Sequence, residues 1–328
     1  MNGIPVGILG TGMYVPERVL TNQDLERMVE TNDEWIVSRT GIRERRIASK
    51  EQASSDLAYE AALEALGNAG VAPEDVELIV VATITPDMSF PSTACILQDR
   101  LGAKKAAAFD LSAACSGFIY GLANASALIA SGMYKNALVI GAECLSKITD
   151  YTDRNTCILF GDGAGAVVIG QVPEGRGFRS FELGADGSGG HLLKACGGGS
   201  RHPISQQVLD EKQQYIYMAG KEVFKFAVKI MGSAAEEALR KAGVEKGDID
   251  LLIPHQANIR IIQSALERLE LPEDKCVVNI NRYGNMSAAS IPIALAEAVR
   301  ENRVKEGDTL LFVGFGGGLT WGASVLVW

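Results

Sequence analysis

Paired cysteines, an excess of positive charge and a long apolar run are all missing from this sequence of 328 residues. Its six cysteines include no CxxC pair, which argues against a disulfide framework or a structural zinc site and fits a reducing cytoplasm. The formal net charge of −9 argues against a nucleic-acid partner, because phosphate binding needs a basic face. No apolar run approaches the roughly 20 residues that cross a bilayer, so we expect no membrane segment.

Targeting and nucleotide-binding signals are missing as well. The first residues, MNGIPVGILGTG, lack a basic segment and a small-residue cleavage site, which favours a first strand over a signal peptide. Two glycine-rich stretches, 160–170 and 313–322, contain neither a Walker A lysine nor GxGxxG between a strand and a helix. We therefore expect close backbone packing there, with a backbone N–H of the second stretch facing an active site.

The chain does contain an internal repeat. Residues 61–82 and 234–255 align without gaps at an offset of 173, and ten of the 22 positions are identical. Each copy reads as an amphipathic helix, an Ala-Gly-Val turn and a buried strand, although chance similarity of alanine-rich helices is an alternative. The repeat predicts an α/β protein of two similar halves, 1–174 and 175–328, each a mixed sheet packed with helices. An irregular surface loop is expected at 192–214.

One cysteine is placed where a strand gives way to a helix. Residues 106–112 read as an apolar strand, a helical pattern runs from Cys115 to Ser131, and Gly132 ends it. The unpaired N–H groups and the positive end of a helix favour a thiolate, which attacks acyl groups readily. On this segment alone, a small buried structural cysteine is an equally good interpretation.

Two residues of the second half could complete such a site. His255 follows the buried strand of the repeat, and strand ends in α/β sheets are where ligand sites are usually built. Asn285 stands between Gly284 and the small-residue segment MSAAS. A structural histidine and a turn asparagine are the alternatives. Together with Cys115 they would provide a nucleophile and two donors able to hold a thioester oxygen as it becomes an enolate.

A tryptophan and several arginines lie close together near the start of the chain, in TNDEWIVSRTGIRERR at 31–46. Such a run is usually a solvated surface. An indole ring for stacking beside guanidinium groups for phosphate would also suit an adenine nucleotide.

These stretches resemble the β-ketoacyl-acyl-carrier-protein synthase III family, and the resemblance covers nearly the whole chain. The motifs are TNDEWIVSRTGIRERR, AFDLSAACSGF, TDRNTCILFGDGAGA, MAGKEVFKFAV, PHQANIRII, RYGNMSAASIP and FGGGLTWG, in the order of the family. The resemblance implies a thiolase fold with α-β-α-β-α layers. It also implies a homodimer that starts type II fatty acid biosynthesis. Its Cys acyl-enzyme would condense a short-chain acyl-CoA with malonyl-acyl carrier protein, releasing CoA and CO2, with no cofactor and no metal.

The resemblance assigns roles to single residues. Catalysis falls on Cys115, His255 and Asn285, with a neutral His255 as a donor and the backbone N–H groups of Cys115 and Gly317 as the oxyanion hole. The implied CoA-binding residues are Thr31, Trp35, Arg39, Arg154, Phe160, Phe224, Ala227 and Asn258. Carrier-protein docking is implied for Lys225, Arg260 and Arg268, and the acyl pocket for Phe90 and Phe315, with Phe90 reaching into the partner subunit. Asn155 and Glu267 depart from some relatives, which puts the contact at 155 and the strength of docking in doubt.

Four other functions fit parts of the pattern. A thiolase would carry a second cysteine in the C-terminal glycine-rich motif, which here reads GFGGGLTWG, and an elongating ketosynthase would have histidine in place of Asn285. A Cys-His hydrolase would let water reach the acyl-enzyme, and slow hydrolysis stays open as a side activity. A non-catalytic acyl-CoA-binding protein would have no need of the three reactive residues. The preferred primer is open, because acetyl, propionyl and branched chains differ by one to three methylenes, each worth about 0.8 kcal/mol of burial.

Overall fold

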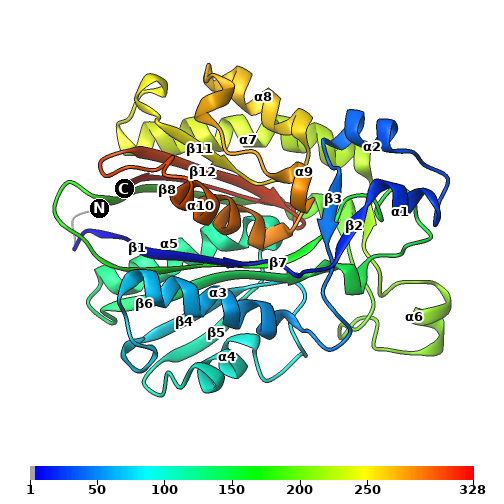
Figure 1. The fold of residues 1–328 in the computed structure, drawn as a ribbon, viewed down its shortest axis with the longest axis horizontal. Coiled ribbons are helices and arrows are strands. Elements are labelled where there is room, and N and C mark those ends of the chain that lie inside the picture. The colour runs from blue at the N-terminus through cyan, green and yellow to red at the C-terminus, as the bar shows by residue number, and fades with distance from the viewer. Residues whose placement is uncertain (1–3) are drawn as a thin grey trace.

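The computed structural model describes residues 4–328 as two mixed β-sheets with helices between and around them (Figure 1). The first sheet has the strand order β1-β7-β6-β4-β5. Its strands are β1 (Val6–Tyr14), β4 (Leu78–Ala82), β5 (Ala107–Leu111), β6 (Asn136–Cys144) and β7 (Asp162–Gln171). The second sheet has the order β11-β12-β13-β8. Its strands are β8 (Gly177–Ala185), β11 (Leu251–Pro254), β12 (Thr309–Gly316) and β13 (Thr320–Val327).

Helices form three layers around the two sheets. The apolar helices α5 (Gly117–Ala130) and α10 (Ser290–Arg300) lie between the sheets. On the outer faces, α3 (Ser54–Ala69) and α4 (Thr93–Leu101) cover the first sheet, and α7 (Gly220–Ala242) and α8 (Ile259–Leu269) cover the second (Figure 1). Phe118 and Leu122 of α5 pack with Ile291 and Leu295 of α10 in the central core. The expected α-β-α-β-α thiolase-like layering is therefore confirmed.

The two sheets repeat one connectivity. In the first, β1 and β7 and then β7 and β6 pair antiparallel, whereas β4 pairs in parallel with β6 and with β5. In the second, β8–β13 and β13–β12 are antiparallel and β12–β11 is parallel. A parallel bridge between Leu252 and Cys276 stands where β5 lies in the first sheet. This is the duplication that the repeat predicts, while the division at 174/175, between β7 and β8, stays a prediction.

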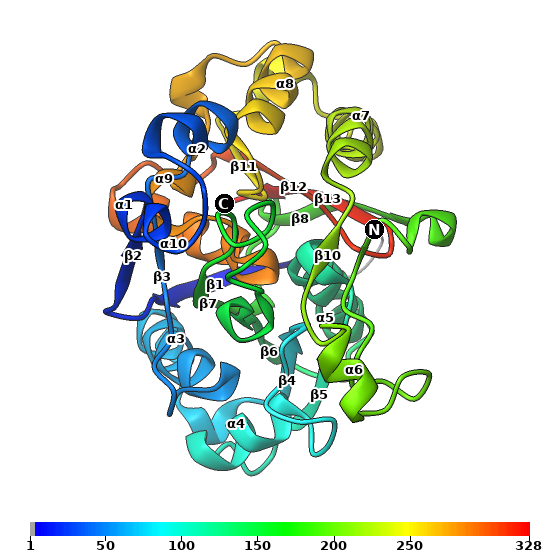
Figure 2. The same ribbon diagram turned by 90° about the vertical axis from the view of Figure 1, so that its right-hand side faces the viewer.

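Short elements connect the halves near one end of the sheets. They are β2 (Val19–Thr21), α1 (Asn22–Glu26), α2 (Asp33–Thr40), β3 (Glu44–Arg46) and α9 (Ile280–Tyr283). The segment expected as a loop at 192–214 is irregular but contains β9 (Leu193–Lys194), which pairs with β10 (Tyr217–Met218), and the short helix α6 (Gln206–Asp210). Helix α2 lies beside α8 (Figure 2). Gly41, which ends α2 with φ +82°, allows this close approach, because any side chain at position 41 would collide with Ile259.

Candidate active site

Cys115 lies in a 3₁₀ turn, Ala114–Ser116, between β5 and α5. The expectation that the helix itself begins at Cys115 is wrong by two residues, since α5 begins at Gly117. The reason is local: Ala114 has a left-handed φ of +46°, which interrupts a right-handed helix. The hydroxyl of Thr320 on β13 donates to Ala113 O at 3.0 Å and ties this turn to the second sheet.

Glycines on β6 and β12 allow the turn before the central helix of each half to pack closely against the other half. A Cβ on Gly316 of β12 would lie 2.5 Å from Cys115 N, and one on Gly314 would lie 3.5 Å from Cys115 O and 3.4 Å from His255 Cβ. In the mirror arrangement, a Cβ on Gly141 of β6 would lie 2.1 Å from Ala288 O. Cys115 and His255 therefore flank the same glycine. The second glycine-rich stretch provides a close backbone approach, as expected.

The Cys115 side chain is buried, with 7% of its surface exposed. Burial raises the pKa of its thiol to about 12; a hydrogen bond with Ser287 lowers the pKa, and the charge of Glu143 raises it. The expected resting thiolate is therefore wrong, because desolvation outweighs the favourable position at a helix start. A base has to remove the proton when the substrate is attacked.

His255 follows β11 and is almost completely buried. Its Nδ1 lies 2.7 Å from Ser290 Oγ, and the same hydroxyl donates to Ser287 O at 2.9 Å. Because a serine hydroxyl has only one proton, the imidazole must donate from Nδ1, which leaves Nε2 as an acceptor. Burial lowers the pKa of His255 to about 3, so the ring is neutral at pH 7. Donation from Nε2, which the resemblance implies, requires the Ser290 hydroxyl to turn from Ser287 O to Nδ1.

Asn285 is held so that its amide orientation is fixed. Its Oδ1 accepts from Ser287 N at 2.8 Å, which leaves the Nδ2 group as the free donor end. Its own backbone is clamped to the segment before β7, with Asn285 N donating to Leu159 O at 2.8 Å and Gly161 N donating to Asn285 O at 3.0 Å. The side chain is therefore an oriented donor in the resting site.

Cys115 opens onto a cavity of about 410 Å³. Its wall includes Ser287, Gly317 and Phe160, and its apolar side includes Ile84 and Leu145. Of the predicted CoA-site residues, Phe160 thus lies at the cavity that contains the nucleophile. The cavity therefore places apolar side chains near the thiol.

Neither of the two residues expected in the acyl pocket is among those that line this cavity. Phe315 packs its ring edge-on against the His255 ring at 5.6 Å between centroids and is otherwise in the core of the second half. Phe90 is 84% exposed, so within one chain it contacts no pocket. The role of Phe315 in the acyl pocket stays a prediction, because its ring lies against His255 beside the site, and that of Phe90 depends on a second subunit.

The nucleotide-binding residues that were expected do gather. The guanidinium of Arg154 lies 4.5 Å and that of Arg39 lies 5.8 Å from the centroid of the Trp35 ring. Asn258, at the start of α8, donates from Nδ2 to Arg39 O at 2.9 Å. Thr31 lies one residue before the N-cap of α2, and its buried Oγ1 has no hydrogen-bond partner among residues 4–328. This corner presents an aromatic ring and two positive charges.

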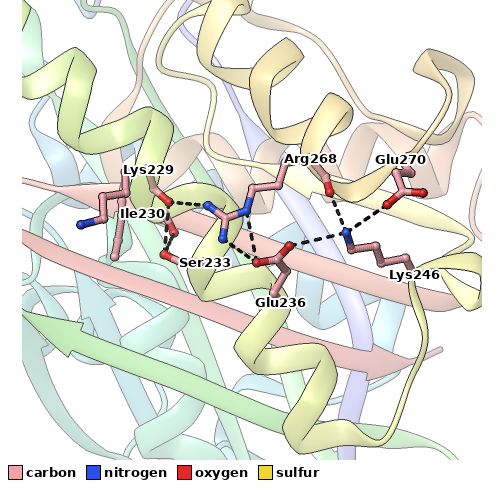
Figure 3. A network of polar contacts seen from close by, with 7 residues as sticks. All are labelled: Lys229, Ile230, Ser233, Glu236, Lys246, Arg268 and Glu270. Atoms are coloured by element: carbon pink, nitrogen blue, oxygen red, sulfur yellow. Dashed lines mark hydrogen bonds and ion pairs between the residues drawn. The ribbon is translucent and has the colours of Figure 1, made fainter.

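The docking residues differ in their surroundings. Lys225 and Arg260 are exposed, and the guanidinium of Arg260 lies 5.1 Å from the ring centroid of Phe224. Arg268 instead crosses α7 at Gly232, and its Nη2 pairs with Glu236 at 2.5 Å (Figure 3). Lys246 also contacts Glu236, at 3.5 Å, and Glu270, at 3.3 Å, in the same network. The charge of Arg268 is therefore already compensated within the chain.

Ala227, expected at the CoA site, is fully buried in the core beside α7, which leaves it no surface for a ligand.

Sequence reasoning missed Glu143, Ser287 and Ser290. Glu143 is a fully buried carboxyl at the end of β6, and burial raises its pKa to about 7. A lone acidic residue in the apolar stretch ALVIGAEC was the available signal. The two serines lie in MSAAS. The contact of Ser290 with His255 depends on how distant segments of the second half pack, and the place of Ser287 at the Cys115 cavity depends on how the halves meet.

Within residues 4–328 no cluster of histidine, cysteine or acidic side chains has the arrangement of a metal site. Over the same residues, no helix has both the length and the apolar character needed to span a membrane.

Known proteins match both halves of the chain. The family model for 3-oxoacyl-[acyl-carrier-protein] synthase III matches residues 109–187, and the model for its C-terminal part matches residues 239–328. A β-ketoacyl-[acyl-carrier-protein] synthase III of Desulfitobacterium hafniense is 62% identical over 99% of this chain and 98% of its own length. The solved 3-oxoacyl-[acyl-carrier-protein] synthase III of Aquifex aeolicus is 51% identical, with a TM-score of 0.92 over 98% of this chain and 100% of its own. That of Thermus thermophilus is 53% identical, with a TM-score of 0.92 over 98% and 99%.

Proposed function

The chain belongs to the 3-oxoacyl-[acyl-carrier-protein] synthase III family, and we propose that Cys115, His255 and Asn285 perform the chemistry of that family here. The enzyme condenses an acyl-CoA with malonyl-acyl carrier protein, releases CO2 and so starts fatty acid synthesis. The observation that carries the assignment is the convergence of the three residues across the two halves. Gly314 lies between Cys115 and His255. Ser287 borders the same cavity as Cys115, and its backbone N–H donates to Asn285.

In the first half-reaction, Cys115 attacks the acyl-CoA carbonyl and CoA leaves. The developing oxyanion would accept hydrogen bonds from the backbone N–H groups of Cys115 and Gly317, which both border the cavity. The tight packing of Gly316 on the Cys115 backbone keeps these two segments together. Each such donor is worth roughly 3–4 kcal/mol of transition-state stabilisation.

In the second half-reaction, loss of CO2 from the malonyl group creates an enolate that attacks the acyl-enzyme. Asn285 Nδ2 is already oriented to donate to the thioester oxygen as it becomes negative. His255 becomes a second donor once the Ser290 hydroxyl turns to its Nδ1. Neutral donors suit this step, because a neutral ring does not need a counter-ion in a buried site.

The nucleotide end of CoA would bind at Trp35, Arg39 and Arg154. An adenine can stack on the indole, while the guanidinium groups face its phosphates. Phe224 and Asn258 would border the pantetheine arm on its way to Cys115. The CoA thioester is a substrate in this scheme and not a resident cofactor.

The carrier protein would dock at Lys225 and Arg260, beside the same entrance. The two cations are exposed on neighbouring helices, α7 and α8. The contribution of Arg268 would be smaller, because Glu236 already neutralises it. A local basic patch lets a chain of net charge −9 attract an acidic carrier domain.

A homodimer in the cytoplasm is the assembly that we propose. Strand β5 lies at the edge of the first sheet and exposes Phe109, and the exposed Phe90 lies in the loop before α4. A second copy pairing along β5 would cover this edge and bring Phe90 to the neighbouring acyl cavity. Free thiols at all six cysteines fit a reducing compartment.

Sedimentation of the wild type and of Phe109→Lys tests the dimer. The variant should sediment as a monomer, and an unchanged dimer would show that the interface lies elsewhere.

Intact-protein mass spectrometry tests the chemistry in two steps. Incubation with a panel of acyl-CoAs should add one acyl group to the wild type and none to Cys115→Ser, which keeps the shape but lacks the thiol. Malonyl-acyl carrier protein added afterwards should remove the acyl group and yield a 3-ketoacyl carrier protein. An acyl group on Cys115→Ser, or acyl-enzyme that persists through the second step, would refute the proposal. The panel also reports the primer preference.

A further inference from the structure

Arg45 is a buried arginine of the motif GIRERR that the chemistry described so far does not use. It is the middle residue of β3, pairs with Leu20 of β2 and has no exposed surface. Burial lowers its pKa only to about 10, so the side chain is charged at pH 7. Glu44 pairs with Arg46, and no ion pair within residues 4–328 includes Arg45. A buried cation without a counter-ion costs stability, so its position needs another reason.

The guanidinium of Arg45 connects two segments that are far apart in the sequence. On one side, Nη1 donates to Asn22 Oδ1 at 2.8 Å and to Leu20 O at 3.3 Å. On the other side, Nη2 donates to Ile158 O. Because a guanidinium is planar and its N–H groups point in fixed directions, it sets how far Ile158 lies from Asn22.

The Asn22 end of this connection is rigid. Asn22 is fully buried, and its Nδ2 donates to Asp33 Oδ1 and to Ile42 O, both at 2.8 Å. Both of its amide hydrogens are therefore used, and Oδ1 has to face Arg45. Asp33 is the first residue of α2 and Ile42 follows the end of that helix. The guanidinium thus ties Ile158 to the base of α2.

The other end of the connection leads to Asn285. Leu159, which follows the acceptor of Nη2, accepts at its O from Asn285 N at 2.8 Å, and Gly161 N donates to Asn285 O at 3.0 Å. The stem of Arg45 packs at the same junction. A Cβ on Gly161 would lie 3.1 Å from Arg45 Cβ, and one on Gly284 would lie 3.4 Å from it. The arginine therefore lies directly against both segments that meet at Asn285.

We propose that Arg45 is a positioning residue for Asn285. It holds the segment 158–161 at a fixed distance from the base of α2, and this segment fixes the backbone from which the Asn285 amide is directed. The inference rests on the proposed function of Asn285 as a donor to the enolate oxygen. Such a donor has to lie about 3 Å from the oxygen that becomes negative, and a displacement of about 1 Å can cost about 100-fold in rate. Arg45 touches no substrate and acts in the second half-reaction, through Asn285.

The test measures labelled CO2 release from malonyl-acyl carrier protein by enzyme that has first been acylated on Cys115. Arg45→Lys keeps the positive charge, but a single ammonium group cannot reproduce the planar fork. With saturating malonyl-acyl carrier protein, CO2 release by this variant should fall by about 10- to 100-fold. The KM for malonyl-acyl carrier protein and the rate of self-acylation with saturating acyl-CoA should stay close to wild type. Arg43→Lys is the matched control: it makes the same change two residues earlier, at an exposed side chain, and should leave all three values unchanged.

A double-mutant cycle separates positioning from a general loosening of the fold. In Asn285→Ala the donor is already absent, so adding Arg45→Lys should lower CO2 release no further. Losses from a general loosening would instead multiply. Thermal unfolding checks that each variant is folded. If Arg45→Lys does not fold, Asn22→Ser replaces it in the cycle, since it removes one anchor of the same guanidinium; its smaller loss should also disappear in the Asn285→Ala background.

The outcomes distinguish this inference from the proposed function on which it rests. Wild-type CO2 release by Arg45→Lys, or losses that multiply in the cycle, would overturn the positioning role and leave the function of Asn285 intact. Wild-type CO2 release by Asn285→Ala would overturn the proposed function of that residue, and the inference with it. A loss in both single variants with no further loss in the double variant supports the inference.

Discussion

Ala114 and Ser287 occupy equivalent positions in the two halves, at the same offset of 173 residues as the internal repeat, and both have φ +46°. Each begins the 3₁₀ turn before a central helix, α5 in one half and α10 in the other. Such a conformation costs about 1–3 kcal/mol for a residue with a side chain. One copy of the strained turn places the nucleophile Cys115, and the other places Ser287 beside it. The duplication thus built one active site from both of its copies.

Asn285→Ala and His255→Ala should separate the two half-reactions. Both variants keep Cys115 and the backbone N–H groups of Cys115 and Gly317, so self-acylation should stay within about tenfold of wild type. Decarboxylation of malonyl-acyl carrier protein should fall by 10²–10³-fold, which is about the effect of losing one oxyanion donor. Labelled CO2 release and acyl-enzyme mass, measured separately, decide the matter. Normal CO2 release from Asn285→Ala would show that its oriented amide has no part in the reaction.

The motif resemblance located the reactive residues, but not the groups that govern their protons. Cys115 and His255 could be placed because a strand end and a helix start are visible in sequence. The predicted sign of the Cys115 pKa shift was wrong, because the strength of burial depends on how closely Gly316 of the other half packs on it. Ser290 was missed because its contact with His255 joins segments 35 residues apart.

The fold was more predictable than the site. Helix, turn and strand recur within 61–82 and 234–255, so the repeat itself indicated two similar sheets. Contacts between segments that are far apart in the sequence carry no such signal. The packing of the Phe315 ring against the His255 ring could therefore not be predicted. In the same way, the basic character of Arg268 was visible in the sequence, but its pairing with Glu236 was not.

Burial of the Glu143 carboxyl should also make the free energy of unfolding depend on pH. Its pKa is about 7 in the folded chain against an ordinary value of 4.5, so the folded state binds more protons in that window and stability falls as pH rises through it. His255 has the opposite effect: its pKa falls from 6.5 to about 3, so stability is lost as pH falls through that range. Between about pH 4.5 and 6.5 the two slopes oppose one another.

Glu143→Gln leaves only the histidine slope. Its free energy of unfolding, relative to wild type, should rise by about 1.4 kcal/mol per pH unit between pH 5 and 6.5. Urea titrations of both proteins at four pH values measure this difference directly. Parallel curves would show that Glu143 ionises in the folded chain as it does in the unfolded one.

Trp35→Ala should weaken binding of the nucleotide end of CoA and nothing else. Loss of the ring removes the stacking surface against which Arg154 lies, an effect of about 1–2 kcal/mol. The KM for acyl-CoA should therefore rise about tenfold with little change in kcat. The control is an acyl-pantetheine thioester, which lacks the nucleotide and should be used equally well by wild type and variant. An equal loss with both thioesters would place Trp35 in the fold of this corner and not in nucleotide binding.

Lys225→Glu combined with Arg260→Glu should raise the KM for malonyl-acyl carrier protein and leave acylation by acyl-CoA unchanged. Both side chains are exposed beside the entrance, where they would steer an acidic partner and pair with it at the rim. The effect should shrink as salt is raised, because the Debye length is about 8 Å at physiological ionic strength and shorter above it. Steady-state kinetics at 20 mM and 300 mM salt, chosen as roughly low and high screening, measure it.

The matched control makes the same charge change at the opposite ends of the strands. Lys135 and Lys305 are exposed and lie just before β6 and β12, away from the ends of β5 and β11 that lead to Cys115 and His255. Their double change to glutamate alters the net charge equally, so any general repulsion of the carrier protein would appear in both variants. Only a KM increase confined to the Lys225 and Arg260 variant supports docking at this surface. Equal values at low salt would instead assign both residues to the ordinary solvated surface.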